Sequence, residues 1–439
     1  MADIRPFHGV HYNQSLIKGL TGVMCPPYDV INRDLQRELY RRSDYNFVRL
    51  EFNRELPQDN ETDNKYTRAS AILDKWLKEE VLTIDDKPAV YIHDHHFSYL
   101  NRQYRRRSII CLVKLEEWDT AVIRPHEGTI SKDKSDRLQM LWTLKANTSS
   151  ILSLYQNSGR QLASLLEAES RREPFLEGKD GNGEVHYLWA VTDPDKIDFI
   201  TNTFRDKPLY IADGHHRYES ALIYRRERRL LSASSSDSDT EKPFDFIMMT
   251  LVDMADSGLL ILPSHRLIRG VSSSMASGLL NGLKTFFTVS EVPLNRENIR
   301  QQVDDLLTEK ENNVKLLLYG LTQERLLVLE LDDFERVSAI TPYFHSDLYQ
   351  RLNVSIVDHV IMEKLLGITY DIAHEHLAYS SDSVDAINSV NEEYQMAVLL
   401  NPVTPEAIKA IADSGDRMPR KSTYFYPKIP TGLVFYRFE

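Results

Sequence analysis

A short apolar strand that ends in an acid, a glycine and three basic residues is the feature that most constrains this chain. The stretch PLYIADGHHRYESALIYRRERRLL covers residues 208–231. Its apolar run predicts a strand that ends at Asp213, and Tyr218 and Leu222 give the following segment an apolar helical face. Gly214 can adopt the positive φ that a tight turn requires. The sequence therefore predicts a strand–turn–helix unit with polar side chains at the turn.

The predicted turn is suited to hold an anion. The first N–H groups of a helix have no partner within the helix and lie at the positive end of its dipole, where phosphate commonly binds. His215, His216 and Arg217 add side-chain donors. An aspartate beside a phosphate often holds Mg²⁺ or orients an attacking hydroxyl. The alternative, that Asp213 only caps the helix and the histidines are surface residues, stays open on the sequence alone.

Other signatures narrow the chemistry. Adjacent histidines on a helix diverge by about 100°, so His215 and His216 do not predict a shared zinc ion. The chain contains no GxxxxGK[ST], GxGxxG or GxSxG motif. A P-loop, a standard dinucleotide fold and a serine-hydrolase elbow are therefore excluded. Cys25 and Cys111 form no CxxC pair, which excludes a cysteine-rich zinc site.

Charge and hydropathy bound the partners. A net charge of −12 over 439 residues opposes non-specific binding to nucleic acid, so no nucleic-acid partner is expected. No run reaches the roughly 18 apolar residues of a membrane-spanning helix, and the first thirty residues lack the apolar segment of a signal peptide. We expect a cytoplasmic protein with no membrane partner. The sequence predicts no oligomeric state.

The order of elements favours an α+β fold. Residues 64–82 carry apolar side chains at helical spacing. Two strand-like runs, 88–100 and 107–118, are separated by the charged NRQYRRR, which predicts an antiparallel hairpin with a basic turn. Because such locally paired strands mix with scattered helices, we expect mixed, largely antiparallel sheets with peripheral helices rather than a regular βαβ alternation.

The chain is expected to form one elaborated domain over residues 1–439. A subdivision would place a core with the phosphate-binding turn in 1–230 and a second lobe, closing the site, in 244–439. Between them, the polar and acidic SASSSDSDTEKP at 232–243 predicts a mobile surface loop.

Further motifs carry a resemblance to a known family. They are RPFHGVHY (5–12), CPPYDVI (25–31), PHEGT (125–129) with DRL (136–138), PSHR (263–266) and MPRKSTYFYPKIPTGLV (418–434). Together with the ADGHHRYESAL stretch they resemble, in order, the bacterial and archaeal domain-of-unknown-function family ten-fifteen. The Asp-Gly-His-His-Arg turn is also similar to the phosphate-binding turn of the ParB and sulfiredoxin superfamily, which includes free-serine kinases that use ADP or ATP. The resemblance implies a ParB/sulfiredoxin-like nucleotide-binding core.

The kinase resemblance also implies an activity. A phosphotransferase of this kind would phosphorylate a small hydroxyl substrate, with free L-serine giving O-phosphoserine as the first choice. The donor would be ATP or ADP, with Mg²⁺ as cofactor, so the expected partners are a nucleotide and a small molecule. Two alternatives stay open: a ParB-like nucleotide-binding switch or slow hydrolase that acts through a protein partner, and a phosphatase.

The same resemblance assigns roles at the turn and names an upstream base. Asp213 would be the acidic residue needed for phosphoryl transfer and a metal ligand, with His216 among the catalytic residues and the phosphates held by Gly214, His215 and Arg217. The small kinases use an upstream glutamate as the base for the serine hydroxyl. Our choice is Glu127 in PHEGT, with His126 beside it as a further catalytic candidate; Glu51 in FVRLEF is the reserve.

The outlying motifs supply further candidate ligands. In CPPYDVI two prolines fix the backbone before Asp29, so the loop can hold an acid in place; the alternative is that Asp29 hydrogen-bonds its own backbone. Without the family, PSHR would be read as ordinary surface residues. The candidate nucleotide ligands are Arg266, Lys421, Ser422 and Thr423, and the candidate substrate ligands are Tyr28, Asp29, His265 and Lys428.

The run HDHH, His93–His96, places His93 and His95 on one face of a strand, as a metal pair would be. The sequence shows no third ligand beside them, so we predict a surface strand.

Overall fold

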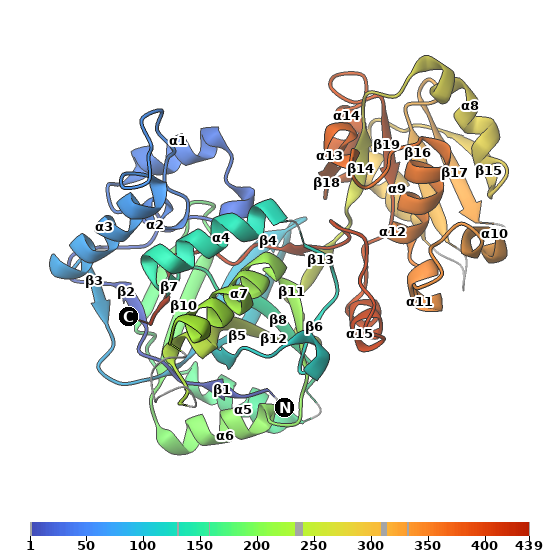
Figure 1. The fold of residues 1–439 in the computed structure, drawn as a ribbon. Coiled ribbons are helices and arrows are strands. Elements are labelled where there is room, and N and C mark those ends of the chain that lie inside the picture. The colour runs from blue at the N-terminus through green and yellow to red at the C-terminus, as the bar shows by residue number, and fades with distance from the viewer. Residues whose placement is uncertain are drawn as a thin grey trace. The chain divides into compact units, whose positions relative to one another are not determined.

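The computed structural model describes residues 2–129, 131–157, 159–232, 240–308, 314–331 and 333–438. Their mixed and antiparallel sheets with surrounding helices confirm the α+β class (Figure 1). The chain divides into two compact units, each described here by itself. Unit 1 comprises Met1–Pro125, Thr129–Leu260 and Pro427–Glu439, and unit 2 comprises His126–Gly128 and Ile261–Tyr426.

The boundary between the two units does not lie at the polar loop 232–243, where the composition suggested a subdivision. Unit 1 continues beyond 230–244 to Leu260, and the last residues, from Pro427, return to it. Of the predicted mobile loop 232–243, residues 233–239 lie outside the described residues. The loop ends in a 3₁₀ turn, η3 (Pro243–Asp245).

Unit 1 is built on a mixed sheet that has nine strands within the described residues, in the order β6-β11-β8-β12-β5-β4-β10-β9 with β1 beside β5. β11 is parallel to β6 and antiparallel to β8, so it lies inside the sheet and not at its edge. The strands are β1 (Ile4–Arg5), β4 (Val90–Tyr99), β5 (Arg102–Lys114), β6 (Ile123–Pro125), β8 (Ile151–Tyr155), β9 (Leu176–Lys179), β10 (Val185–Val191), β11 (Leu209–Asp213) and β12 (Phe246–Asp253).

Helices α4 and α7 lie side by side on unit 1 (Figure 1). Tyr218 and Leu222 of α7 are buried in the core, as the apolar spacing predicted. The predicted helix at 64–82 is confirmed as α3, which begins with a capping box between Asn64 and Thr67. The helices are α1 (Arg33–Arg42), α2 (Val48–Glu51), α3 (Lys65–Lys78), α4 (Ser131–Leu144), α5 (Arg160–Glu169), α6 (Pro194–Phe204) and α7 (His215–Ser232). Two small sheets pair β2 (Val10–Tyr12) with β3 (Leu82–Ile84) and β7 (Ala146–Asn147) with β21 (Tyr436–Arg437).

The predicted hairpin is confirmed as the antiparallel pair β4–β5, but the prediction of a basic turn is wrong. The turn is formed by Leu100 and Asn101, which both have positive φ. The arginine run belongs to β5 because the neighbouring strand supplies its partner: Arg107 lies opposite Asp94 and donates to it at 2.6 Å.

The prediction of a surface strand at HDHH is also wrong. His93 and His95 are 1% and 0% exposed, on a strand that lies inside the sheet between β5 and β10. Their rings stack with a centroid distance of 5.8 Å.

Unit 2 has a sheet of six strands within the described residues, in the order β15-β17-β16-β19-β14-β18, and every pair is antiparallel. The strands are β14 (His265–Ile268), β15 (Phe287–Pro293), β16 (Lys315–Tyr319), β17 (Arg325–Leu331), β18 (Leu377–Ser380) and β19 (Met396–Leu399); β13 (Leu260–Leu262) pairs with β20 (Tyr424–Tyr426). The helices are α8 (Ser273–Leu283), α9 (Ile299–Leu307), α10 (Phe334–Ser338), α11 (Asp347–Gln350), α12 (Asn353–Ile356), a π-helix η4 (Val357–Leu365), α13 (Ala373–His376), α14 (Ser383–Asn388) and α15 (Pro405–Asp413).

Among the described helices, none combines the length and the apolar character needed to cross a lipid bilayer.

Candidate functional site

The strand–turn–helix prediction is confirmed in unit 1. β11 ends at Asp213, Gly214 has a φ of +99°, and α7 begins at His215. A Cβ atom at position 214 would lie 3.0 Å from the Arg217 guanidinium. The backbone conformation therefore favours glycine here, and a Cβ atom would crowd the Arg217 side chain that folds back over the turn.

Two cations hold the carboxylate of Asp213. Its Oδ1 accepts a hydrogen bond from Lys428 Nζ, and its Oδ2 accepts one from Arg217 Nη2 at 2.7 Å. Burial acts to raise the pKa of Asp213, but the charges of Lys428 and Arg217 outweigh it and bring this pKa well below its usual range. Asp213 is therefore ionised at neutral pH and fixes two cationic side chains beside the start of α7.

Arg217 leaves one donor at the turn without a partner. Its Nη1 donates to the carbonyl oxygen of Ser150, whereas its Nε is buried and has no hydrogen-bond partner within the described residues. An unpaired buried N–H is costly, and an anionic oxygen at the turn would supply the missing acceptor.

The CPPYDVI motif lies at the same place. Tyr28–Val30 form a 3₁₀ turn, η1, and Asp29 Oδ2 lies 3.9 Å from Lys428 Nζ. Lys428 thus stands between the carboxylates of Asp29 and Asp213. Segments of three motifs that are far apart in sequence, at 25–31, 208–231 and 427–434, therefore meet in unit 1.

Replacing Lys428 with Met tests this arrangement. The pKa of Asp213 is expected to rise toward its ordinary value, at a cost of about 1.5–3 kcal/mol in the free energy of unfolding at pH 7. A depressed carboxylate pKa stabilises the folded state above the unfolded pKa of about 4, and this contribution is lost as the pH falls. Urea unfolding measured from pH 7 to pH 3 should therefore show that the difference in the free energy of unfolding between the two proteins becomes smaller in acid. Lys18→Met, at an exposed position, is the control and should change little; a gap that does not depend on pH would contradict the ion pair.

Glu51, the reserve base, is fully buried in unit 1. Its Oε2 accepts from Thr148 Oγ1 at 2.5 Å, and its Oε1 lies 3.4 Å from the Tyr28 N–H and 3.5 Å from Arg137 Nη1. The Arg137 guanidinium also lies 3.8 Å from the centre of the Tyr28 ring. These contacts make Glu51 an anchor for the turn that carries Asp29.

Arg137 has a second carboxylate partner, Asp136, at 2.5 Å, and Lys65 reaches Asp136 at 2.7 Å. Burial acts to raise the pKa of Asp136, but Arg137 and Lys65 lower it to about 2. Sequence reasoning gave no role to these residues. The only signal in the sequence was that Asp136 and Arg137 belong to the DRL motif, one of the family motifs, to which no function was assigned.

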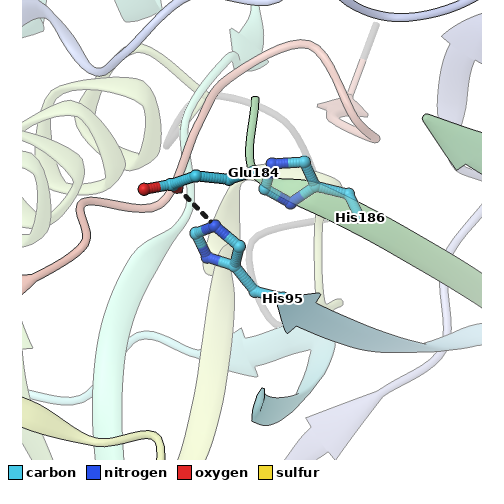
Figure 2. Close-up of side chains that lie close together, drawn as sticks. All are labelled: His95, Glu184 and His186. Atoms are coloured by element: carbon cyan, nitrogen blue, oxygen red, sulfur yellow. Dashed lines mark hydrogen bonds and ion pairs between the residues drawn. The ribbon is translucent and has the colours of Figure 1, made fainter. Parts of the chain in front are cut away.

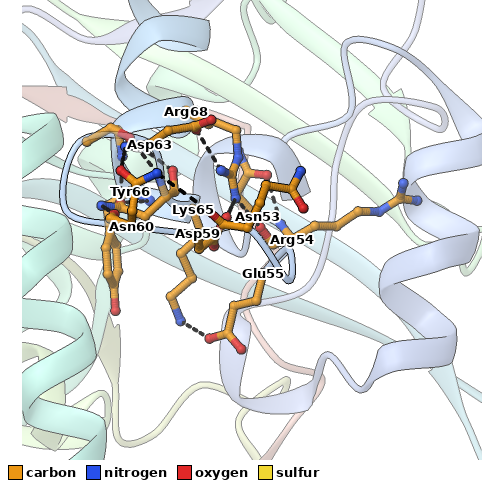
Figure 3. Close-up of polar contacts among 12 residues, drawn as sticks. Asn53, Arg54, Glu55, Asp59, Asn60, Asp63, Lys65, Tyr66 and Arg68 are labelled. Carbon is orange, nitrogen blue, oxygen red and sulfur yellow. Dashed lines mark hydrogen bonds and ion pairs between the residues drawn. The ribbon is translucent and has the colours of Figure 1, made fainter.

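The loop before α3 continues this network, as Figure 3 shows. Lys65 also binds Glu55 at 2.8 Å. Arg68 binds Asp59 and Asp63, at 2.8 and 2.7 Å, and donates to the backbone oxygen of Arg54. The loop is thereby tied to the helix that supplies Lys65.

A second group of predicted site residues lies in unit 2. Glu127 Oε1 accepts a hydrogen bond from the backbone N–H of Lys421 at 2.9 Å. His126 is buried, and its Nε2 lies 3.0 Å from Thr423 Oγ1. The Ser422 hydroxyl is also buried and donates to the carbonyl oxygen of Pro419. The PHEGT and MPRKSTYFYPK motifs therefore meet, with Glu127 partly exposed.

His265 and Arg266 are not the surface residues that the bare sequence suggested. Both are buried in β14, which lies inside the sheet between β19 and β18. Arg266 Nε lies 3.3 Å from Asp358 Oδ1 and its Nη1 donates to the carbonyl oxygen of Ser264. Burial and the charge of Arg266 lower the pKa of His265 to about 4, so this ring is neutral.

Comparison with known proteins names the family. A family model described as "Protein of unknown function (DUF1015)" matches residues 4–355. The chain belongs to the DUF1015 family. This confirms the resemblance drawn from the motifs. The comparison of the DUF1015 chain with curated proteins gave no match.

Several solved structures resemble the DUF1015 protein distantly. A free serine kinase variant in complex with ADP is 11% identical, with 72% of this chain and 87% of that chain covered and a TM-score of 0.36. A conserved hypothetical protein from Pyrococcus furiosus is 13% identical (74% and 93% covered, TM-score 0.35). C-terminally truncated SbnI from Staphylococcus aureus is 10% identical (74% and 86% covered, TM-score 0.33). Likenesses of this size do not establish a function, so the function has to be inferred from the residues of the site.

The predicted site residues of the DUF1015 protein thus fall into two groups. Unit 1 brings Asp213 and Arg217 together with Lys428 and Asp29, and it also contains the reserve base Glu51. Unit 2 contains His126, Glu127, His265, Arg266, Lys421, Ser422 and Thr423. The pairing of Asp213 with Glu127 stays a prediction.

The donor set around Asp213 fits a phosphate better than a bare metal ion. Both carboxylate oxygens already accept from cations, and Lys428 and Arg217 place positive charge there. Mg²⁺ prefers oxygen ligands and commonly takes several of them from substrate phosphates. The predicted assignment of Asp213 as a Mg²⁺ ligand therefore stays a prediction, and no step below depends on it.

Proposed function

We propose that this DUF1015 protein is a nucleotide-dependent phosphotransferase that acts on a small hydroxyl compound, with free L-serine as the first candidate. One observation carries the proposal: an ionised Asp213 holds Lys428 and Arg217 beside the first turn of an 18-residue helix. Such a constellation concentrates donors and positive charge where a phosphoryl group would sit.

Each group then has a role in transfer. Lys428, the unpaired Nε of Arg217 and the N-terminus of α7 stabilise negative charge on the transferring phosphoryl group. His215 and His216 begin the same helix, and their side chains add hydrogen-bond donors at its N-terminus. Asp213 keeps the two cations in place and orients the attacking hydroxyl. The hydroxyl oxygen forms the new bond to phosphorus, the bond to the nucleotide oxygen breaks, and a general base takes the hydroxyl proton.

Two variants distinguish between the candidate bases Glu127 and Glu51. Glu127→Gln is expected to lower turnover by about 10²- to 10⁴-fold with little change in stability, because Glu127 is partly exposed. Glu51→Gln is expected to destabilise the protein by about 1–3 kcal/mol, because its buried carboxylate serves Thr148, Arg137 and Tyr28. Initial rates and urea unfolding of both variants measure this. Full turnover in Glu127→Gln together with lost turnover in a stable Glu51→Gln would transfer the role to Glu51.

The function itself is tested by mixing purified protein with Mg²⁺, ATP or ADP in turn, and a panel of amino acids and small hydroxy acids, followed by ³¹P NMR. Phosphoserine formed only with serine and one nucleotide is the expected result. Stoichiometric nucleotide binding without any phosphorylated product would replace the kinase by a nucleotide-binding switch that acts through a protein partner. Phosphate release from phosphoserine without a nucleotide would identify a phosphatase.

A further inference from the structure

A compact group of metal-ligating side chains lies in unit 1 on strands that the proposed phosphate site does not use. His95 of β4 and His186 of β10 are direct cross-strand neighbours, and Glu184 precedes β10. One potential ligand atom from each of the three lies within 4.8 Å of the other two, and Figure 2 shows the three side chains converging. Both histidines are 0% exposed.

His186 is oriented as a metal ligand would be. Its Nδ1 lies 3.0 Å from His93 Nε2, and its Nε2 is buried with no hydrogen-bond partner within the described residues. The nearest carboxylate, of Asp180, is 3.8 Å away from this nitrogen, beyond hydrogen-bond distance. Metal-binding histidines typically use one nitrogen for the metal and hold the ring by hydrogen-bonding the other. A buried nitrogen left without a partner needs an explanation, and a metal ion supplies one.

We propose that His95, Glu184 and His186 form a binding site for a divalent transition metal, with Zn²⁺ preferred. Two imidazoles and one carboxylate are a zinc donor set that leaves a fourth position for water. Mg²⁺ and Ca²⁺ prefer all-oxygen ligands and fit less well. The carboxylate of Asp180 adds nearby negative charge. Because the ligands come from two neighbouring strands, bound zinc fastens β10 to β4 and stabilises the folded state.

One contact of His95, with Arg106, disfavours metal binding. Arg106 is buried, and its Nη2 lies 3.2 Å from His95 Nδ1, while His95 Nε2 lies 2.6 Å from Glu184 Oε2. Without metal, Arg106 donates to Nδ1 and the ring proton on Nε2 is donated to Glu184. When Zn²⁺ bonds to Nε2, this ring proton moves to Nδ1 and the Arg106 donor has to turn away. Metal binding therefore competes with Arg106.

The first experiment uses the full-length protein, treated with EDTA, dialysed and titrated with ZnCl₂ or CoCl₂. We expect one metal ion per chain by elemental analysis, the visible bands of four-coordinate Co²⁺, and a higher melting temperature with Zn²⁺. A wild-type protein that binds no Zn²⁺ would overturn the proposal.

Variants locate the metal. His186→Gln and Glu184→Gln should each weaken Zn²⁺ binding at least tenfold, and partly exposed Glu184 provides a second route if the buried His186 variant does not fold. His96→Gln is the matched control, because His96 follows His95 on β4 and points to the opposite face, with its ring 5.4 Å from that of Tyr187. Equal binding by Glu184→Gln, or equal loss in His96→Gln, would overturn the assignment.

Arg106→Gln tests the competition. Glutamine removes the guanidinium donor that faces His95 Nδ1, so Zn²⁺ should bind this variant more tightly than the wild-type protein, provided that its metal-free melting temperature shows a folded chain. Weaker binding in a folded variant would contradict the proton shift. All of these readouts are independent of phosphoryl transfer.

Discussion

Asp213→Asn is expected to lower turnover by about 10²- to 10⁴-fold while nucleotide binding is retained. The amide has nearly the shape of the carboxylate but carries no charge, so it no longer pairs with Lys428 and Arg217. Arg217 still donates to the carbonyl oxygen of Ser150, and Lys428 still lies 3.9 Å from Asp29, so both cations remain available to phosphate oxygens. Transfer fails because the hydroxyl loses its orienting group, whereas nucleotide affinity stays the same or increases.

Initial rates with the substrate found by ³¹P NMR, and calorimetric titration with the same nucleotide, separate the two effects. Asp29→Asn is the matched control: its carboxylate lies 3.9 Å from Lys428 and makes no close ion pair with it, so its loss should cost less turnover. Wild-type turnover in Asp213→Asn would exclude the proposed role of Asp213.

Arg137→Leu is expected to destabilise unit 1 by about 3–5 kcal/mol at pH 7. The change leaves the buried carboxylate of Glu51 without its cation and removes one of the two cations that hold Asp136. The contact with the Tyr28 ring is lost as well. The four tryptophans of the chain, Trp76, Trp118, Trp142 and Trp189, all lie in unit 1, so urea unfolding followed by tryptophan fluorescence reports on this unit.

The effect of Arg137→Leu should also depend on pH. The wild-type pKa of Asp136 is lowered to about 2, so its contribution to stability is present above the unfolded pKa of about 3.9 and is lost as the pH falls toward 2. The difference in the free energy of unfolding between the wild-type protein and Arg137→Leu should therefore become smaller in acid. Arg41→Leu changes an exposed arginine of α1 and should stay within about 0.5 kcal/mol. A comparable loss in Arg41→Leu would show that the effect is not specific to the buried network.

Local signals predicted the part of the site that is built from one stretch of chain. The period of the apolar residues determined β11 and the buried face of α7, and the glycine after Asp213 determined the turn, because both properties depend only on neighbouring residues. The prolines of CPPYDVI likewise predicted a rigid turn before Asp29. The family motifs then named Lys428 as a site residue without saying what it contacts.

Other expectations failed where strand order mattered. The charged run after β4 looks like a turn in sequence, yet Arg107 belongs to β5 because Asp94 lies opposite it. His93 and His95 look exposed on one strand, yet they are buried, and β10 places His186 directly opposite His95. The carboxylate next to His95 could not be found from HDHH because Glu184 is 89 residues from His95 along the chain.

The sequence by itself determined the family, the α+β class, the strand–turn–helix unit at Asp213 and most of the candidate site residues. The tertiary structure decided which of them meet: Lys428 with Asp213, Glu51 with Tyr28 and Arg137, Glu127 with Lys421, and His95 with Glu184 and His186. Helical and strand periods act over a few residues, whereas the position of a partner from a distant segment depends on how the strands are ordered and which faces are buried.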